Sequence, residues 1–227
     1  MQAPSSKALT IAVFGARGTG KTAWITQQLK NAKPPRLILW DFKHDPALEG
    51  MGKPYHSLPE FVRSLKGATF ASRYLVNHSG DIQKQFDFFC MAAWQAGCLI
   101  MFVDELPEVT KANKAPANWR RCVNVGRDYK DAQGNRKWLG IIGAGQRPAE
   151  CDKSFISNAD VIHTGRLSNS ADARELAQSL ACDFRDLLAL PDLHWIERRA
   201  GQIEPARGIL SFSRKKSSDP KPRQKAA

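Results

Sequence analysis

The sequence has no cysteine pair with metal-binding spacing and no apolar run long enough to cross a membrane. None of its five cysteines forms a Cys-x-x-Cys pair, which favours buried thiols in a reducing compartment. The longest apolar run, 88–103, is interrupted by Gln95 and Gly97 and is shorter than the roughly 20 residues of a spanning helix. The first ten residues also lack the apolar core of a secretory signal. We therefore expect a cytoplasmic protein that is not an integral membrane protein.

Acidic residues are in short supply, with 22 Asp and Glu against 34 Lys and Arg, so that the formal net charge is +12. A surplus of this size favours a polyanionic partner, either nucleic acid or an anionic membrane surface. The composition is otherwise that of a globular protein, with 42% hydrophobic and 25% charged residues. We expect one domain over 1–213, followed by a basic tail over 214–227 that is predicted to be disordered.

Short runs rich in Ile, Leu and Val alternate with stretches of helical pattern, which predicts an α/β fold with a mostly parallel sheet flanked by helices. Ser57 and Glu60 are spaced as a capping box at the start of the second helix. Near the end of the domain, 194–199 and 208–213 predict a short C-terminal β-hairpin. The other predicted strands are 9–14, 36–41, 73–77, 99–104, 139–144 and 161–164, and the predicted helices are 21–30, 58–65, 82–96, 118–125 and 171–180.

A phosphate-binding loop is predicted where the first strand meets the first helix. Residues 10–22 read TIAVFGARGTGKT, which matches G-x-x-x-x-G-K-[ST] in the strand–loop–helix context that this motif requires. Glycines allow the backbone N–H groups to approach phosphate oxygens, and the helix N-terminus faces the same anion. We expect Lys21 to reach the β- and γ-phosphates and Thr22 to ligate Mg²⁺. The predicted site for ATP or a related nucleotide comprises Gly15, Ala16, Arg17, Gly18, Thr19, Gly20, Lys21 and Thr22.

Two acidic residues follow the apolar run CLIMFV at the predicted carboxyl end of the fourth strand. Asp104 has the position of the acidic residue that holds the Mg²⁺ shell in P-loop enzymes. Glu105 is placed to take a proton from an attacking water as a general base. A second acidic residue favours hydrolysis over transfer to another acceptor. The pair therefore indicates an NTP hydrolase.

Several further segments give the sequence a resemblance to the FtsK/HerA superfamily of nucleic-acid-translocating ATPases. The strand after the acidic pair ends in a Gln-Arg-Pro triplet, and the second strand ends in Asp-x-Lys followed by an acidic residue. A Gly-Arg pair lies in a basic helix, and a later strand ends in Arg-Leu. This resemblance runs from about residue 9 to residue 167. The matching residues are Asp41, Lys43, Asp45, Gly126, Arg127, Gln146, Arg147, Pro148, Arg166 and Leu167.

The resemblance implies a P-loop NTPase of the RecA-like, ASCE type that forms a homo-oligomeric ring, typically a hexamer. In such a ring a neighbouring subunit's arginine enters each nucleotide site and stabilises charge on the transferring phosphoryl group. Arg127 and Arg166 are the two candidates for this arginine finger, with Arg127 slightly preferred. Gln146 is a candidate sensor of the γ-phosphate.

The small size of the chain makes it most similar, within this superfamily, to the genome-packaging ATPases of tailless icosahedral viruses with an internal membrane. That resemblance implies translocation of double-stranded DNA into a preformed capsid. It further implies a place in the host cytoplasm and at the packaging vertex of the virion, beside capsid vertex or membrane-associated proteins.

A basic, polar stretch over 111–137, with Trp119 and Tyr129 interleaved, is the predicted nucleic-acid surface. Basic side chains neutralise phosphates, and aromatic rings stack on the bases of single strands. For Trp119, packing against a neighbouring helix is the favoured alternative. The predicted DNA contacts are Lys111, Lys114, Arg120, Arg121, Arg136 and Lys137.

Three other functions fit parts of the sequence. A small nucleotide or metabolite kinase shares the phosphate loop, but it requires an arginine-bearing lid and an acceptor pocket. A filamentous-phage-type assembly ATPase requires a membrane-spanning helix. A non-catalytic assembly protein would use nucleotide only as a structural ligand. Glu105 distinguishes this function, because replacement by Gln should abolish the turnover of an enzyme while ATP binding is retained, and unchanged turnover would remove Glu105 from the catalytic role.

Overall fold

A computed structural model of the chain describes residues 8–211. The predicted tail over 214–227 and the domain boundary at residue 213 lie outside this range. Within it, no helix combines the length and the apolar character that a membrane span requires.

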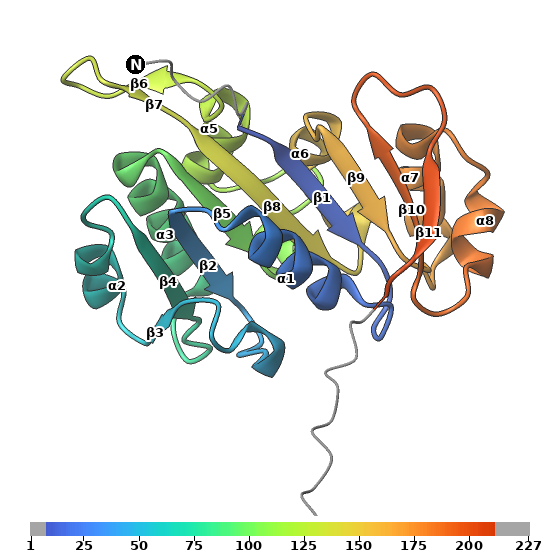
Figure 1. The fold of residues 1–227 in the computed structure, drawn as a ribbon, viewed down its shortest axis with the longest axis horizontal. Helices are drawn as coiled ribbons and strands as arrows, with labels where there is room; N and C mark the ends of the chain where they lie inside the picture. Colours follow the sequence, from blue (N-terminus) through green and yellow to red (C-terminus); the bar gives the residue numbers. More distant parts are fainter. Residues whose placement is uncertain (1–7, 212–227) are drawn as a thin grey trace, which may run out of the picture.

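A nine-stranded sheet forms the centre of the molecule (Figure 1), in the order β11-β10-β9-β1-β8-β5-β2-β4-β3. The neighbours from β9 to β3 are parallel, whereas β10 is antiparallel to both β9 and β11. The strands are β1 (Thr10–Phe14), β2 (Arg36–Asp41), β3 (Lys53–Tyr55), β4 (Phe70–Leu75), β5 (Leu99–Val103), β8 (Leu139–Gly145), β9 (Val161–Thr164), β10 (His194–Arg199) and β11 (Ala206–Ile209).

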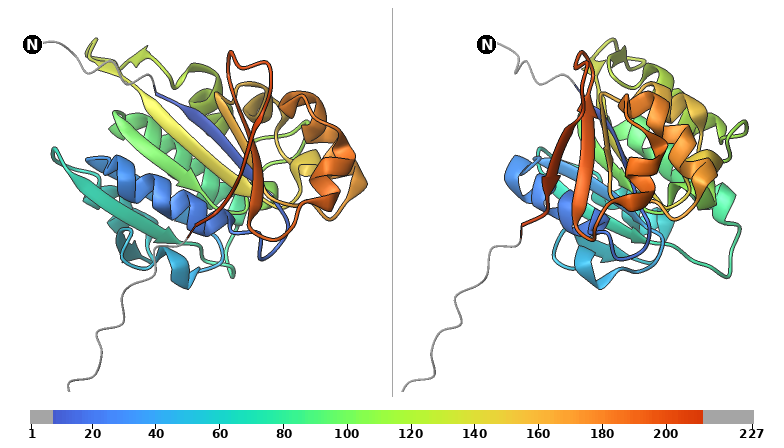
Figure 2. Two further views of the ribbon diagram at one scale, coloured as in Figure 1. Left: turned by 45° about the vertical axis from the view of Figure 1, so that its right-hand side comes forward. Right: turned by 90° about the vertical axis from the view of Figure 1, so that its right-hand side faces the viewer.

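Helices cover both faces of this sheet, which makes three layers (Figure 2). On one face α1 packs through Trp24 and Ile25 against a core that includes Val13 and Phe102. The other face holds the larger core, in which Trp40 contacts aromatic side chains of α3. The helices are α1 (Lys21–Ala32), α2 (Leu58–Ser64), α3 (Ile82–Ala96), α4 (Leu106–Val109), α5 (Ala117–Val125), α6 (Lys153–Ser157), α7 (Ser170–Leu180) and α8 (Phe184–Ala189), with short 3₁₀ turns at Pro46–Leu48 and Pro148–Glu150.

The predicted α/β fold is confirmed, including the C-terminal hairpin, which is formed by β10 and β11. Several details differ from the sequence-based expectation. The second strand of the hairpin spans Ala206–Ile209 rather than beginning at residue 208, and β3, α4 and α8 were not predicted. Strand β4, which was predicted over 73–77, begins at Phe70 and ends at Leu75. Ser57 occupies the N-cap position of α2, but its side chain accepts no capping hydrogen bond, so the predicted capping box is wrong.

Strand β8 lies between β1 and β5, and its glycines allow close packing there. A Cβ atom at Gly143 would come within 2.6 Å of the Phe155 ring, and one at Gly145 within 2.6 Å of Pro107 in α4. A larger side chain at either position would therefore push away a helix that packs on this strand. This arrangement brings the ends of β1, β8 and β5 together at the carboxyl edge of the sheet.

A second, two-stranded antiparallel ribbon, β6 (Tyr129–Lys130) with β7 (Arg136–Lys137), precedes β8. It extends from the amino edge of the main sheet, at the end opposite the phosphate loop (Figure 1).

Candidate active site

The predicted phosphate loop forms a tight turn between β1 and α1. Gly15, Gly18 and Gly20 have φ angles of 146°, 82° and 91°. Residues other than glycine rarely adopt these backbone angles. A Cβ atom at Gly15 would also approach Thr19 Oγ1 to 2.6 Å. Lys21 begins α1 and its Nζ donates hydrogen bonds to the carbonyl oxygens of Gly15 (2.8 Å) and Ala16 (3.0 Å). The lysine ammonium therefore lies against the loop that is predicted to hold phosphate.

The loop is fixed from two sides by other parts of the chain. The backbone N–H of Ala16 donates to the carbonyl oxygen of Arg166, at 2.7 Å, just beyond β9. On the other side, Thr22 Oγ1 donates to Asp45 Oδ2 at 3.2 Å. Asp45 follows β2, so the sheet positions the hydroxyl that is expected to ligate Mg²⁺.

Asp104 directly follows β5 and is buried. Its Oδ2 accepts no hydrogen bond within the described residues 8–211. Burial raises the pKa of Asp104 to about 7, against the opposing attraction of the Lys43 charge. A buried carboxylate oxygen without a donor is a group that a bound cation would satisfy.

Glu105 follows directly and is held in an unusual backbone conformation. Its φ and ψ angles of 47° and 55° place it in the left-handed region as the N-cap of α4, a strained position for a residue with a side chain. The buried carboxylate forms an ion pair with Lys43 and accepts hydrogen bonds from Gln146 Nε2 at 3.0 and 3.3 Å. These contacts orient the group that is predicted to act as the base.

The four predicted groups Lys21, Asp104, Glu105 and Gln146 thus meet at the carboxyl edge of three adjacent strands. Gln146 follows β8 and reaches Glu105 from the neighbouring strand. Burial lowers the pKa of Lys21 to about 8, and the nearby charge of Glu105 opposes that shift. Clustered buried charges with shifted pKa values at a strand edge are typical of a catalytic site.

The donor set fits Mg²⁺, which prefers oxygen ligands and keeps few protein contacts beside substrate phosphates. Thr22 offers a hydroxyl, and Asp104 offers a carboxylate oxygen that has no partner in the described part of the chain. Residues 8–211 contain no group of three or more His, Cys, Asp or Glu side chains that would hold a metal by themselves.

The two finger candidates lie in different places. Arg127 is at the amino edge of the sheet, away from its own phosphate loop, and its Nη1 donates to Asp160 Oδ1 at 2.8 Å. Arg166 lies beside its own loop and pairs with Asp192 at 2.8 Å. Action in a neighbouring subunit stays a prediction for both arginines.

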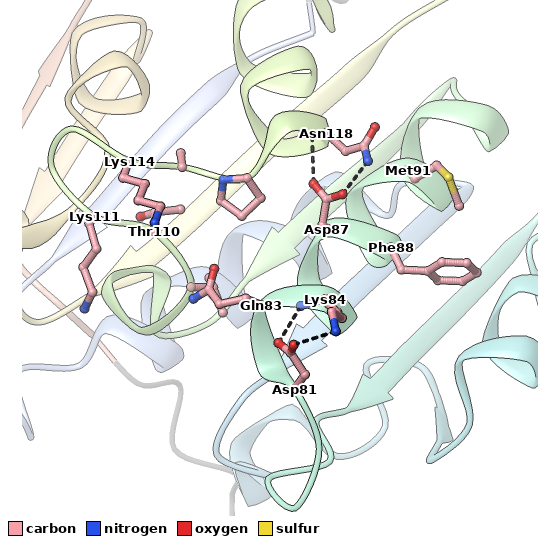
Figure 3. Close-up of a pocket in the computed structure, with 13 residues that line it drawn as sticks. Asp81, Gln83, Lys84, Asp87, Phe88, Met91, Thr110, Lys111, Lys114 and Asn118 are labelled. Carbon is pink, nitrogen blue, oxygen red and sulfur yellow. Dashed lines mark hydrogen bonds and ion pairs between the residues drawn. The ribbon is translucent and has the colours of Figure 1, made fainter.

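The predicted DNA contacts do not form one continuous surface. Lys111 and Lys114 lie on the loop between α4 and α5, whereas Arg136 and Lys137 are on the ribbon at the opposite edge. The two lysines line a groove of about 650 Å³ together with residues of α3. Figure 3 shows their side chains among those that line it. No phosphate-loop residue lines this groove. DNA binding by these residues, and by Arg120 and Arg121 on α5, stays a prediction.

The two aromatic residues of the basic stretch 111–137, Trp119 and Tyr129, are packed into the fold and are not free to stack on bases. Trp119 is fully buried and its Nε1 donates to Asp152 Oδ2 at 2.9 Å. Tyr129 is buried against Trp94, with ring centroids 3.7 Å apart, and Arg121 lies over the Trp94 ring. The alternative interpretation of Trp119 as a packing residue is the one that the structure supports.

Two residues of the site have contacts that the sequence did not reveal. Lys43 and Asp45 were matched only as part of the FtsK/HerA pattern, yet they contact Glu105 and Thr22. A signal was present in their position, since both follow a strand expected to end at the ligand-binding edge.

Together, the order of strands, the glycine loop and the acidic pair define a P-loop NTPase fold of the RecA-like, ASCE type. No protein-family model matches the sequence. Protein P9 of Pseudoalteromonas phage PM2 is 25% identical over 185 residues, which are 80% of this chain and 79% of that protein.

Two solved structures confirm the predicted resemblance at the level of the fold. The genome packaging NTPase B204 from Sulfolobus turreted icosahedral virus 2, in complex with ATP-γ-S, has a TM-score of 0.71 and 16% identity, with 91% of this chain and all of that chain covered. The bacterial conjugative coupling protein TrwB has a TM-score of 0.60 and 11% identity, with 93% and 90% covered.

Proposed function

We propose that this chain is an ATP-hydrolysing motor that translocates double-stranded DNA and packages a viral genome into a preformed capsid. The observation that carries the proposal is the contact of Gln146 with Glu105 beside the phosphate loop. This contact exists because β8 lies between β1 and β5. The likeness in fold to a genome packaging NTPase supports the choice of cargo. The relatives described above include no nucleotide or metabolite kinase.

In the proposed reaction, the loop backbone and Lys21 bind the triphosphate and neutralise part of its charge. Thr22 and Asp104 would hold Mg²⁺, which supplies further positive charge to the phosphate oxygens. Glu105 accepts a proton from water as the water oxygen bonds to the γ-phosphorus and the bond to the β-phosphate oxygen breaks. The products are ADP and inorganic phosphate. Gln146 holds the carboxylate of Glu105 toward the attacking water.

The proposed partners follow from charge and from the relatives. A net charge of +12 favours a polyanion, and double-stranded DNA is the cargo of a packaging motor. We infer a homo-oligomeric ring, with six subunits as the working number, in which Arg127 or Arg166 completes a neighbour's site. Such a motor acts in the host cytoplasm at a capsid vertex, where capsid or membrane-associated proteins would anchor it.

The proposal is tested by ATP turnover of the full chain with and without double-stranded DNA. We expect DNA to raise turnover at low salt and the stimulation to fade as salt increases, because phosphate contacts release counterions. Lys21→Met serves as the control without phosphate binding and should have no turnover under either condition. Absence of DNA binding at low salt would refute translocation, and turnover that ignores DNA would refute coupling.

A further inference from the structure

Lys43 brings a second cation to the phosphate site. It lies two residues beyond β2, and β2 pairs with β5 in the register Trp40 to Val103. This pairing places Lys43 beside the residues that follow β5, and its Nζ forms an ion pair with Glu105 Oε1. The contact joins residues 62 positions apart in the chain.

The two partners of this ion pair differ strongly in exposure. The Lys43 side chain is 46% exposed, whereas the Glu105 side chain is 7% exposed. The ammonium therefore covers the buried carboxylate from the solvent side, while Gln146 holds it from the neighbouring strand. In the proposed reaction the γ-phosphate and the attacking water lie close to Glu105. They therefore also lie close to the ammonium group of Lys43.

Within residues 8–211, Glu105 is the one ion-pair partner of Lys43. Buried Asp41, which ends β2, pairs instead with Arg73 of the neighbouring strand β4 at 3.3 Å. Asp45 receives the hydroxyl of Thr22. Burial is the main cause of the lowered pKa of Lys21, and the charge of Lys43 lowers this pKa further, as expected for two ammonium groups that lie near each other. Two like charges held near each other favour binding of a polyanion between them.

We propose that Lys43 is a second phosphate-binding lysine, which exchanges the carboxylate of Glu105 for the γ-phosphate of a bound nucleoside triphosphate. The exchange frees Glu105 from its counter-ion, so that the carboxylate can accept a proton from water. A nucleoside diphosphate has no γ-phosphate and leaves the ion pair intact. The inference rests on the proposed ATP site but is independent of DNA and of packaging.

Equilibrium binding of ATP-γ-S and ADP to the full chain, both with Mg²⁺, tests this exchange. We expect Lys43→Met to weaken binding of ATP-γ-S about tenfold or more, as for loss of a charge-assisted hydrogen bond. ADP binding should change by less than about threefold, since it never used this contact. Lys43→Arg should retain most of the preference for ATP-γ-S. Lys53→Met, at an exposed lysine of β3, is the control and should bind both nucleotides as the wild type does.

A second variant keeps the test valid if Lys43→Met exposes an uncompensated buried carboxylate and unfolds. Glu105→Gln removes the counter-ion, so the ammonium needs no exchange, and we expect ATP-γ-S to bind several-fold more tightly with ADP unchanged. Adding Lys43→Met to this variant should abolish that gain. Equal effects on both nucleotides, or faster turnover with unchanged affinities, would overturn the proposal. DNA-independent turnover with intact preference for ATP-γ-S would instead refute only the motor function.

Discussion

The carboxyl and amino edges of the central sheet both carry charged side chains, but they satisfy those charges differently. At the carboxyl edge, Asp104 and Glu105 are buried, and one oxygen of Asp104 has no partner within residues 8–211. At the amino edge, Arg136 lies exposed in a two-bond contact with Asp128, and this hydrogen bonding lowers the pKa of Asp128. At the carboxyl edge a bound ligand can therefore supply the missing partner of a buried charge. At the amino edge Arg136 already has a partner within the chain.

We expect this difference to separate residues that act on a ligand from residues that stabilise the fold or lie on its surface. Buried charges without full pairing cost stability and persist where function requires them. Exposed, paired charges contribute little to stability and respond to salt. The two edges should therefore answer differently to substitution, and four changes of decreasing effect test that expectation.

The largest effect is expected from Glu105→Gln. Removal of the proposed general base should lower kcat about 10³-fold, because general-base catalysis contributes roughly 10²–10⁴-fold. Nucleotide binding should persist, since the phosphate loop is unchanged. Single-turnover hydrolysis together with ATP-γ-S binding measures both quantities. Unchanged kcat would remove Glu105 from the catalytic role and favour a protein that uses nucleotide only as a structural ligand.

Asp104→Asn should stabilise the protein at high pH, in the absence of Mg²⁺ and nucleotide. The pKa of Asp104 rises from 3.8 to about 7 on folding, so the folded state penalises the charged form. The penalty is absent below pH 4, grows between pH 4 and 7, and is complete above pH 7. A shift of this size corresponds to about 4 kcal/mol. Urea unfolding of wild type and variant at pH 4 and pH 8 measures it, and an equal difference at both pH values would contradict the assignment.

Arg127→Met should have a smaller effect, confined to stability in an isolated subunit. The change removes the ion pair with Asp160, whose other side-chain oxygen accepts from the Thr10 N–H at 2.8 Å. We expect a loss of about 1 kcal/mol, the upper range for partly exposed pairs, and unchanged affinity for ATP-γ-S. The urea midpoint and a binding titration measure these.

The same variant also tests the finger in trans. When Arg127→Met protein is mixed with wild-type protein, turnover should fall below the value expected from dilution of the wild type alone. The same mixing experiment with Arg166→Met tests the other candidate. Turnover that follows simple dilution for both variants would exclude a trans-acting role for either arginine.

The sequence alone predicted which residues lie together at the carboxyl edge, because the motifs there are local. The glycine loop, Lys21 and the acidic pair lie in short segments whose spacing is set by one strand–loop–helix unit, and apolar runs marked the buried strands on each side. Gln146 was also found, since it follows such a strand directly. Local patterns of this kind predict a site when all parallel strands end at the same edge.

The remaining features depend on strand order and on tertiary contacts. The pairing of Lys43 with Glu105 requires β2 beside β5, and no local pattern fixes that neighbour. The left-handed backbone of Glu105 was hidden because such φ values are usually marked by glycine. Short elements such as α4 and the β6–β7 ribbon have too few residues for a periodic signal. Because the ribbon lies at the amino edge, it separates Arg136 and Lys137 from the lysines of the loop between α4 and α5.

The smallest effect is expected from Arg136→Ala on the exposed ribbon. Its guanidinium donates to Asp128 at 2.7 and 2.8 Å, and the two side chains are 76% and 56% exposed. A DNA phosphate would have to displace this carboxylate, so the net gain from Arg136 is small and the urea midpoint should not change. Lys114→Ala, on the loop beside α4, should instead lower the salt dependence of DNA binding by about one phosphate contact. A larger loss from Arg136→Ala than from Lys114→Ala would place the DNA at the amino edge and reverse the contrast between the two edges.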